Sequence, residues 1–258
     1  MGSPPAFEVA TIKLWVPGVY MREASTGDDN PFVTMGSVEM LIASAYNISP
    51  MSSRIFGGPQ WIGSLNNMYV VQGKIPGDYF VQMKYMNLDE RKEVVRSMLR
   101  SLLAERFHLQ AHLETRQLPV YELTIAKGGP RLPSPIDNDA GVDGIKPRAG
   151  STVGLLTKEG VVVRNRTLDS MLGFGWFGLG DRPIINKTGL TGKYNLTIHW
   201  IPEESSSGNP DPAAIPKAPE GQASIFTVLQ EQLGLKLSPA TGPVSVLVID
   251  RVERPSPN

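Results

Sequence analysis

The sequence contains no cysteine among its 258 residues. Disulfide bonds, thiolate metal ligands and cysteine nucleophiles are therefore excluded. A chain without cysteine also suits an oxidising compartment, where a free thiol is a liability. The sequence also lacks an apolar run approaching the roughly 18 residues that a membrane-spanning helix needs, so we expect no membrane span within it.

The sequence also lacks an excess of positive or negative charge. The chain carries 25 basic and 25 acidic residues, so its formal net charge is zero. Without a basic excess we expect no nucleic-acid partner and no attraction to an anionic membrane. With 41% hydrophobic and 19% charged residues, the composition is that of a globular protein with one large domain or two small ones.

The stretch from Pro183 to Trp200 organises the rest of the chain. It places a proline, two glycines and a strand led by Tyr194 in that order, and a fainter copy runs from Gly58 to Gln72. Each copy is preceded and followed by a helical pattern. We therefore predict an internal duplication, in which Pro59 corresponds to Pro183, Tyr69 to Tyr194 and Leu109 to Leu235.

This repeat predicts the α+β class, with two similar lobes that each have a small, mostly antiparallel sheet and two helices on one face. A polar segment rich in proline and glycine divides the lobes, and a second such segment interrupts the later lobe. The predicted lobes span 1–130 and 151–258, with a linker at 131–150 and a mobile insertion at 202–222.

Helix ends carry local signals. Ser37 and Ser224 precede apolar helical patterns and are expected to cap them, and Gly234 is the expected left-handed stop of the last helix. Each lobe is predicted to end in a hairpin. The first pairs Phe107–Glu114 with Pro119–Ala126, and the second pairs Leu235–Leu237 with Val244–Val252. Four leucines are predicted to be core residues: Leu99, Leu103, Leu229 and Leu233.

Several stretches together resemble one family. They include F-E-V-A-T-I-K, G-G-P-Q-W, L-L-A-E-R-F-H-L-Q-A-H-L-E-T-R-Q-L-P-V-Y-E-L, R-P-I-I-N-K-T-G-L-T-G-K-Y-N-L-T-I-H-W and V-I-D-R-V-E-R-P-S. The chain is similar along nearly its whole length to the soil-bacterial, acidobacteria-enriched family of unknown function DUF3738. The resemblance implies an exported protein, because similar domains occur fused behind a BlaR-type membrane metallopeptidase. It implies no reaction and no catalytic residues.

Two positions depart from the family's pattern. Asn186 stands before K-T-G-L where the family usually has an acidic residue, and Arg251 stands where histidine is common. A carboxylate role at the first position and a histidine role at the second are therefore in doubt.

Histidines and carboxylates are the candidates for chemistry. His108 and His112 are four positions apart, and Glu114 shares their face of a predicted strand, which allows a metal site with two histidines and one carboxylate. A solvated strand face is the alternative, and we favour it, so no metal and no cofactor are expected. A hydrolytic site that uses His199 and Asp250 is a second possibility, although no G-x-S-x-G motif is present. The weak catalytic candidates are therefore His112, Glu114, His199 and Asp250.

Two tryptophans are the candidates for ligand binding. Trp61 lies in a turn with glycines and a proline, and Trp176 lies in the glycine-rich run Gly173–Gly180. Tryptophan is favoured at binding centres. We predict that both rings line a ligand or partner surface with Arg182 nearby. The alternative is that both rings only close the ends of their sheets.

The preferred function is an extracytoplasmic binding or interaction module for an unknown small molecule, peptide or protein. The runner-up is a secreted hydrolase, esterase-like or peptidase-like, with a non-standard site between the lobes. The sequence opens at Met1-Gly2-Ser3, and we expect the native gene to encode an export segment or anchor before Phe7. The protein is thus expected to be periplasmic or secreted.

Overall fold

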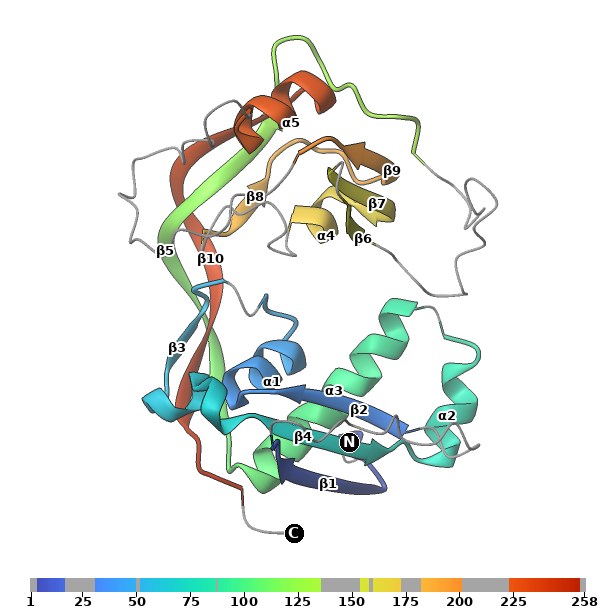
Figure 1. The fold of residues 1–258 in the computed structure, drawn as a ribbon, viewed down its shortest axis with the longest axis vertical. Coiled ribbons are helices and arrows are strands. Elements are labelled where there is room, and N and C mark those ends of the chain that lie inside the picture. The colour runs from blue at the N-terminus through green and yellow to red at the C-terminus, as the bar shows by residue number, and fades with distance from the viewer. Residues whose placement is uncertain are drawn as a thin grey trace. The chain divides into compact units, whose positions relative to one another are not determined.

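The structure is a computed structural model. It describes residues 4–16, 31–49, 52–86, 88–135, 154–157, 160–172, 182–200 and 223–255. The predicted insertion 202–222, the loop Gly173–Gly180 and most of the predicted linker 131–150 lie outside the described residues. Five helices and ten strands in mixed sheets confirm the α+β class (Figure 1).

The chain forms two compact units. Unit 1 comprises Met1–Glu114 with Ser245–Asn258, and unit 2 comprises Thr115–Val244. The units therefore divide the chain at other places than the predicted lobes. The cause is two long strands, β5 (Gln110–Ile125) and β10 (Leu235–Arg251), which pair with each other and each run through both units.

The two predicted hairpins are wrong, because β5 and β10 are each one continuous strand. Within β5 the segment before Pro119 has no glycine, asparagine or aspartate to make a tight turn. Within β10, Gly242 and Pro243 do offer turn chemistry, but the long pairing with β5 holds the backbone extended. Pro119 and Pro243 are both exposed, as prolines within strands usually are.

Unit 1 contains an antiparallel sheet of order β1-β4-β2, formed by β1 (Val9–Leu14), β4 (Tyr69–Lys74) and β2 (Pro31–Gly36). Its helices are α1 (Val38–Ala45), α2 (Gly77–Met83) and α3 (Leu88–Arg106), and two 3-10 turns, η1 (Gln60–Gly63) and η2 (Leu65–Asn67), precede β4. The short strand β3 (Ile55–Gly57) pairs in parallel with β10. Ser37 caps α1 as predicted, because its side chain accepts from the Met40 N–H.

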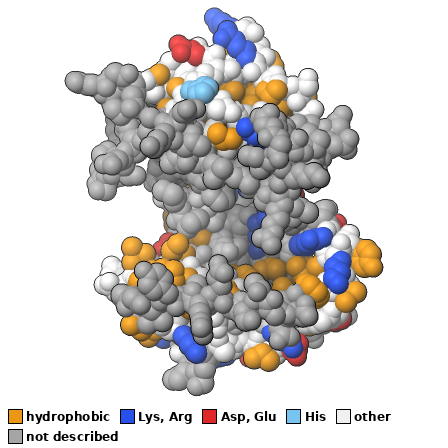
Figure 2. All heavy atoms as spheres, turned by 45° about the vertical axis from the view of Figure 1, so that its right-hand side comes forward, with side chains coloured by type: hydrophobic (Ala, Val, Ile, Leu, Met, Phe, Trp, Pro, Cys, Tyr) orange, Lys and Arg blue, Asp and Glu red, His pale blue; other side chains and the backbone are white. Residues whose placement is uncertain are grey.

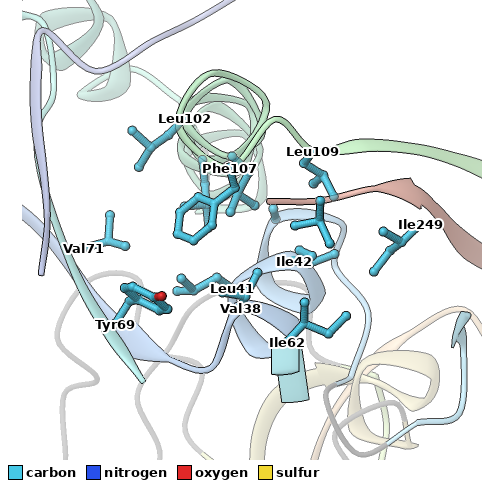
Figure 3. Packing of buried hydrophobic residues seen from close by; sticks show 14 of the residues in the cluster. Val38, Leu41, Ile42, Ile62, Tyr69, Val71, Leu102, Phe107, Leu109 and Ile249 are labelled. Atoms are coloured by element: carbon cyan, nitrogen blue, oxygen red, sulfur yellow. The ribbon is translucent and has the colours of Figure 1, made fainter. Parts of the chain in front are cut away.

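The core of unit 1 lies between its sheet and the helices α1 and α3. Tyr69 and Val71 of β4 are buried there, and the Tyr69 ring meets Phe107 edge-on with ring centroids 5.6 Å apart. Ile249, from β10, is packed into the same cluster with Leu109 (Figure 3). The end of the chain is therefore part of the core of unit 1.

Unit 2 has a second antiparallel sheet of order β6-β7-β9, formed by β6 (Gly154–Thr157), β7 (Gly160–Thr167) and β9 (Lys193–Ile198). Its helices are α4 (Leu168–Leu172) and α5 (Ile225–Leu233), and β8 (Ile184–Asn186) pairs in parallel with β5. Ser224 caps α5, and Gly234 ends it with φ 64°, both as predicted. The four leucines predicted to be core are all buried: Leu99, Leu103, Leu229 and Leu233.

Helices α3 and α5 end in the same way. Leu103 and Leu229 are fully or almost fully buried at matching positions five residues before the helix stop. The stop itself is left-handed in both cases, with φ 49° at His108 and φ 64° at Gly234. Long strands β5 and β10 follow, so the helix-to-strand junction recurs in the two halves of the sequence.

The strand-to-helix junctions also recur. Tyr69 pairs with the residue immediately before the Ser37 cap of α1, and Tyr194 pairs with the residue immediately before Thr167. Thr167 in turn accepts from the Ser170 N–H at the start of α4. The predicted correspondence of Tyr69 with Tyr194 agrees with these pairings.

One predicted correspondence has the wrong register. Leu247 N–H donates to the Arg54 carbonyl as β3 joins β10, and Tyr121 N–H donates to the Pro183 carbonyl as β8 joins β5. Pro183 thus matches Arg54, not Pro59, because Pro59 follows its short strand whereas Pro183 precedes it. That the two halves of the sequence superpose remains a prediction. In the corrected register, Pro183 corresponds to Arg54.

Two glycines allow the cost of backbone strain to be measured apart from the cost of steric crowding where β3 pairs with β10. Gly57 and Gly129 both have φ 76°. A Cβ at Gly57 would lie 2.6 Å from the Ile249 carbonyl oxygen, whereas a Cβ at Gly129 would meet nothing within 4 Å. We expect Gly129→Ala to cost about 1–2 kcal/mol from the left-handed backbone alone. Gly57→Ala should cost about 1–3 kcal/mol more, because β10 must also move.

The measurement is urea unfolding of the two variants beside the wild type, with each midpoint converted to a free energy of unfolding. Equal losses in the two variants would show that β10 does not constrain Gly57.

Candidate functional site at the end of strand β10

His112 and Asp250 meet where β5 begins and β10 ends, both within unit 1. The His112 Nδ1–H donates to Asp250 Oδ2 at 2.9 Å. On the other side of the ring, His112 Nε2 lies 3.9 Å from Glu114 Oε2. Three of the four predicted catalytic candidates are therefore brought together, and the carboxylate of Asp250 fixes the orientation of the imidazole.

A second group of charges follows Asp250. Arg251 donates from Nε to Glu253 Oε1 at 2.9 Å, and His108 Nδ1 lies 3.5 Å from Glu253 Oε2. The hydrogen bond and positive charge of Arg251 hold the pKa of the Glu253 carboxyl below its ordinary value, with a smaller contribution from His108. The Glu253 N–H also donates to the Phe107 carbonyl at 2.7 Å, which ties this segment to the end of α3.

Trp61 is joined to this group of charges through Arg254. The ring belongs to η1, is half-buried and packs against the core of unit 1. The Arg254 guanidinium lies over it, 5.0 Å from the ring centroid, which is a cation–π distance. The positive-φ glycines Gly57 and Gly58 make the turn that leads to it. We call this whole surface the C-terminal cluster: Trp61, His108, His112, Glu114, Asp250, Arg251, Glu253 and Arg254.

Water reaches the polar part of the C-terminal cluster. The side chains of His112, Asp250 and Glu114 are 52%, 47% and 38% exposed. Charge pairs at this exposure are screened, and each contributes at most about 1 kcal/mol to stability. The two ring nitrogens of His112 face different carboxylates. Among the described residues no group of three or more metal-ligating side chains is found, so the alternative of a metal site with two histidines and one carboxylate gains no support from them.

The other predicted site residues lie elsewhere. His199 belongs to unit 2, where its backbone N–H donates to Gln232 and its carbonyl accepts from the same side chain. Asp250 has His112 as its partner, not His199. Arg182 lies over the Tyr121 ring in unit 2 at 5.2 Å. Trp176 is outside the described residues, so the surface proposed for Trp61, Trp176 and Arg182 stays a prediction.

Sequence reasoning missed Glu253 and Arg254. The available signal was the triplet Arg251-Val252-Glu253, in which a buried valine lies between two charged residues that are not buried. That pattern indicates a strand-like segment with one face in the core and the other in water. Arg251 is a local partner of Glu253, but the contacts of Glu253 with His108 and of Arg254 with Trp61 join segments far apart in the sequence, which this pattern does not reveal.

A second surface of unit 1 is apolar. Val81 and Tyr85 are exposed at and just after α2, and Lys84 Nζ lies 5.1 Å from the Phe80 ring centroid. Figure 2 shows hydrophobic side chains exposed among Lys and Arg side chains on this unit.

Across the described part of the chain, no helix has the length and apolar character needed to cross a membrane.

Comparison with known proteins gives a family and nothing closer. The family model described as a protein of unknown function, DUF3738, matches residues 39–252. This span contains β3, β5 and the whole of β10, as well as Trp61, His112 and Asp250. No curated protein matches, and no solved structure matches.

The Arg251–Glu253 pair predicts a pH-dependent contribution to stability. Because the pKa of Glu253 is depressed in the folded state, its contribution is present above the ordinary carboxyl pKa of about 4.3 and is lost as the pH falls through the folded pKa. We expect Arg251→Gln to raise the pKa of Glu253 toward the ordinary value, as measured by an NMR titration of its side chain. The matched control Arg254→Gln should leave it depressed, and a shift of equal size in that control would contradict the assignment to Arg251.

Proposed function

Because the chain belongs to the DUF3738 family, whose function is unknown, we propose from its own residues that it is an extracytoplasmic binding or interaction module. Its ligand is a small molecule, peptide or protein, and the C-terminal cluster is the surface that binds it. The observation that carries this proposal is the group of polar contacts at the end of β10, together with the Arg254 guanidinium that lies over the half-buried ring of Trp61.

Exposure favours binding over catalysis. Enzymes place their charged groups in water-excluded sites, where electrostatic stabilisation of a transition state is strong. His112 and Asp250 are about half exposed, so a ligand would meet them without first having to enter a closed site. Polar and aromatic groups on a rigid scaffold are typical of binding surfaces.

The charges of the C-terminal cluster favour a ligand with both signs. Glu114, Asp250 and Glu253 supply carboxylates, and Arg251 and Arg254 supply guanidinium groups. A peptide offers an amine, a carboxylate and backbone hydrogen-bonding groups, and so it complements such a surface. Peptides are therefore the first probes to try.

We expect short peptides that raise the melting temperature to shift backbone NMR signals of residues 57–61, 112–114 and 250–254. Trp61→Ala and Asp250→Asn should each weaken binding by about tenfold or more, since each removes one of the contacts that define the cluster. Trp200→Ala is the matched control, because Trp200 packs against the core of unit 2. Peptides that shift only unit 2, or that bind both cluster variants like the wild type, would contradict the proposal.

A second candidate function rests on one distance. The 2.9 Å bond from His112 to Asp250 is the arrangement that orients a histidine general base in hydrolases. A secreted esterase-like or peptidase-like hydrolase would use His112 Nε2 to activate water or a hydroxyl group. Glu114 lies on that side of the ring.

Under this second candidate we expect hydrolysis of a chromogenic acetate ester or a fluorogenic peptide to fall at least 100-fold in His112→Gln. His108→Gln is the matched control, because His108 is also exposed and faces a carboxylate of the same cluster. Equal rates in the two variants, or no turnover above buffer by the wild type, would exclude hydrolysis by this dyad.

The extracytoplasmic location is supported by the absence of cysteine from the whole sequence. We expect the natural protein to fractionate with periplasmic or secreted markers from cells that produce it, as measured with an antibody against this chain. Recovery with a cytosolic marker would contradict export. This outcome is independent of whether the C-terminal cluster binds a ligand.

A further inference from the structure

The second part of β10 belongs to a different unit from the chain that precedes it. Residues 245–258 belong to unit 1, although the chain immediately before them belongs to unit 2, and Thr115–Val244 forms unit 2 without them. Unit 1 is therefore completed by a segment that arrives from outside it. Such an arrangement is the one-chain form of the strand exchange seen in domain-swapped oligomers.

The contacts of this segment are extensive and specific. Leu247, Ile249 and Val252 are buried in the core of unit 1, in one cluster with residues of α1 and α3. Figure 3 shows Ile249 in this cluster. Burial of apolar side chains of this size is a main source of folding stability, so the segment contributes substantially to this core. The positions are fixed by the β3–β10 pairing and by the Asp250–His112 hydrogen bond.

The segment is held in unit 1 by strand pairing as well as by its apolar side chains. It pairs with β3 and with the start of β5. Its withdrawal from unit 1 therefore requires the separation of β10 from these two strands. The cost is the exposure of one strand's apolar residues, which an identical strand would cover again.

We infer that unit 1 accepts residues 245–255 of a second copy of this chain in place of its own, giving a strand-exchanged dimer. A second copy is the occupant that reproduces every contact of the present interface, including the Arg54 and Phe107 carbonyl bonds. In the exchanged dimer, Asp250 of one chain would orient His112 of the other, so each C-terminal cluster would be composite.

The protein concentration during refolding sets the ratio of the closed monomer to the strand-exchanged dimer. Within one chain, a tethered segment acts at an effective concentration in the millimolar range, so the closed monomer predominates in dilute solution. Refolding at high protein concentration lets the second copy compete. The ratio of exchanged dimer to monomer should then rise about tenfold for a tenfold rise in concentration, because dimer formation is bimolecular.

The absence of cysteine makes a clean test possible. His112→Cys and Asp250→Cys chains, each with a single thiol, are unfolded together in urea, refolded at graded concentrations and mildly oxidised. We expect a covalent dimer with one chain of each kind, seen on a non-reducing gel and mapped by mass spectrometry to positions 112 and 250. The control pairs Asp250→Cys with Lys13→Cys, whose position lies on β1, a strand that pairs with β4.

Light scattering of the wild-type chain after the same refolding gives a readout that does not depend on disulfide geometry. A dimer that increases with refolding concentration is expected. A wild type that stays monomeric at every concentration, or a 112–250 dimer no more abundant than the Lys13→Cys control, would overturn the inference. A dimer formed only when peptide is added would show instead that another extended segment competes for this place.

Discussion

The pairing of β5 with β10 is the interaction on which the rest of the structure depends. Each of these strands contributes one part to unit 1 and the other part to unit 2. Leu247 and Ile249 complete one core, while Tyr121 and Leu123 complete the other. Unit 1 is thus made from two pieces of sequence that are separated by the whole of unit 2. Contacts between segments so far apart must overcome a large loop-closure entropy, which makes the folding of such topologies slow.

The same pairing explains why the C-terminal cluster has no sequence motif. His112 and Asp250 are 138 positions apart along the chain, yet they share a hydrogen bond. The aromatic partner, Trp61, comes from a third segment that reaches the cluster only because β3 pairs with the other side of β10. The side chains of a surface made from three distant segments have defined positions in the fold. Their separations along the sequence follow no regular pattern, so no sequence motif marks them.

What the sequence predicts well is local. The caps at Ser37 and Ser224 and the left-handed stop at Gly234 depend on residues within one helical turn, and all three are confirmed. The hairpins failed because the turn signal at Gly242 and Pro243 competes with a partner strand that only the fold supplies. At the site, the sequence grouped His112 with Glu114 on one strand face and proposed Asp250 separately. It matched Asp250 with the wrong histidine because strand register is not encoded locally.

His108 shows how the repeated junction has been adapted to the site. It adopts φ 49°, where a residue with a side chain is strained, while the matching position in the other half of the sequence is Gly234. Glycine is required at 234, since a Cβ there would strike the Gly129 carbonyl oxygen. At 108 a side chain is accommodated, and its imidazole reaches Glu253. Strain of this kind persists where surrounding contacts compensate for it. The contact with Glu253 is thus a reason to keep histidine at a position where glycine would relieve the backbone.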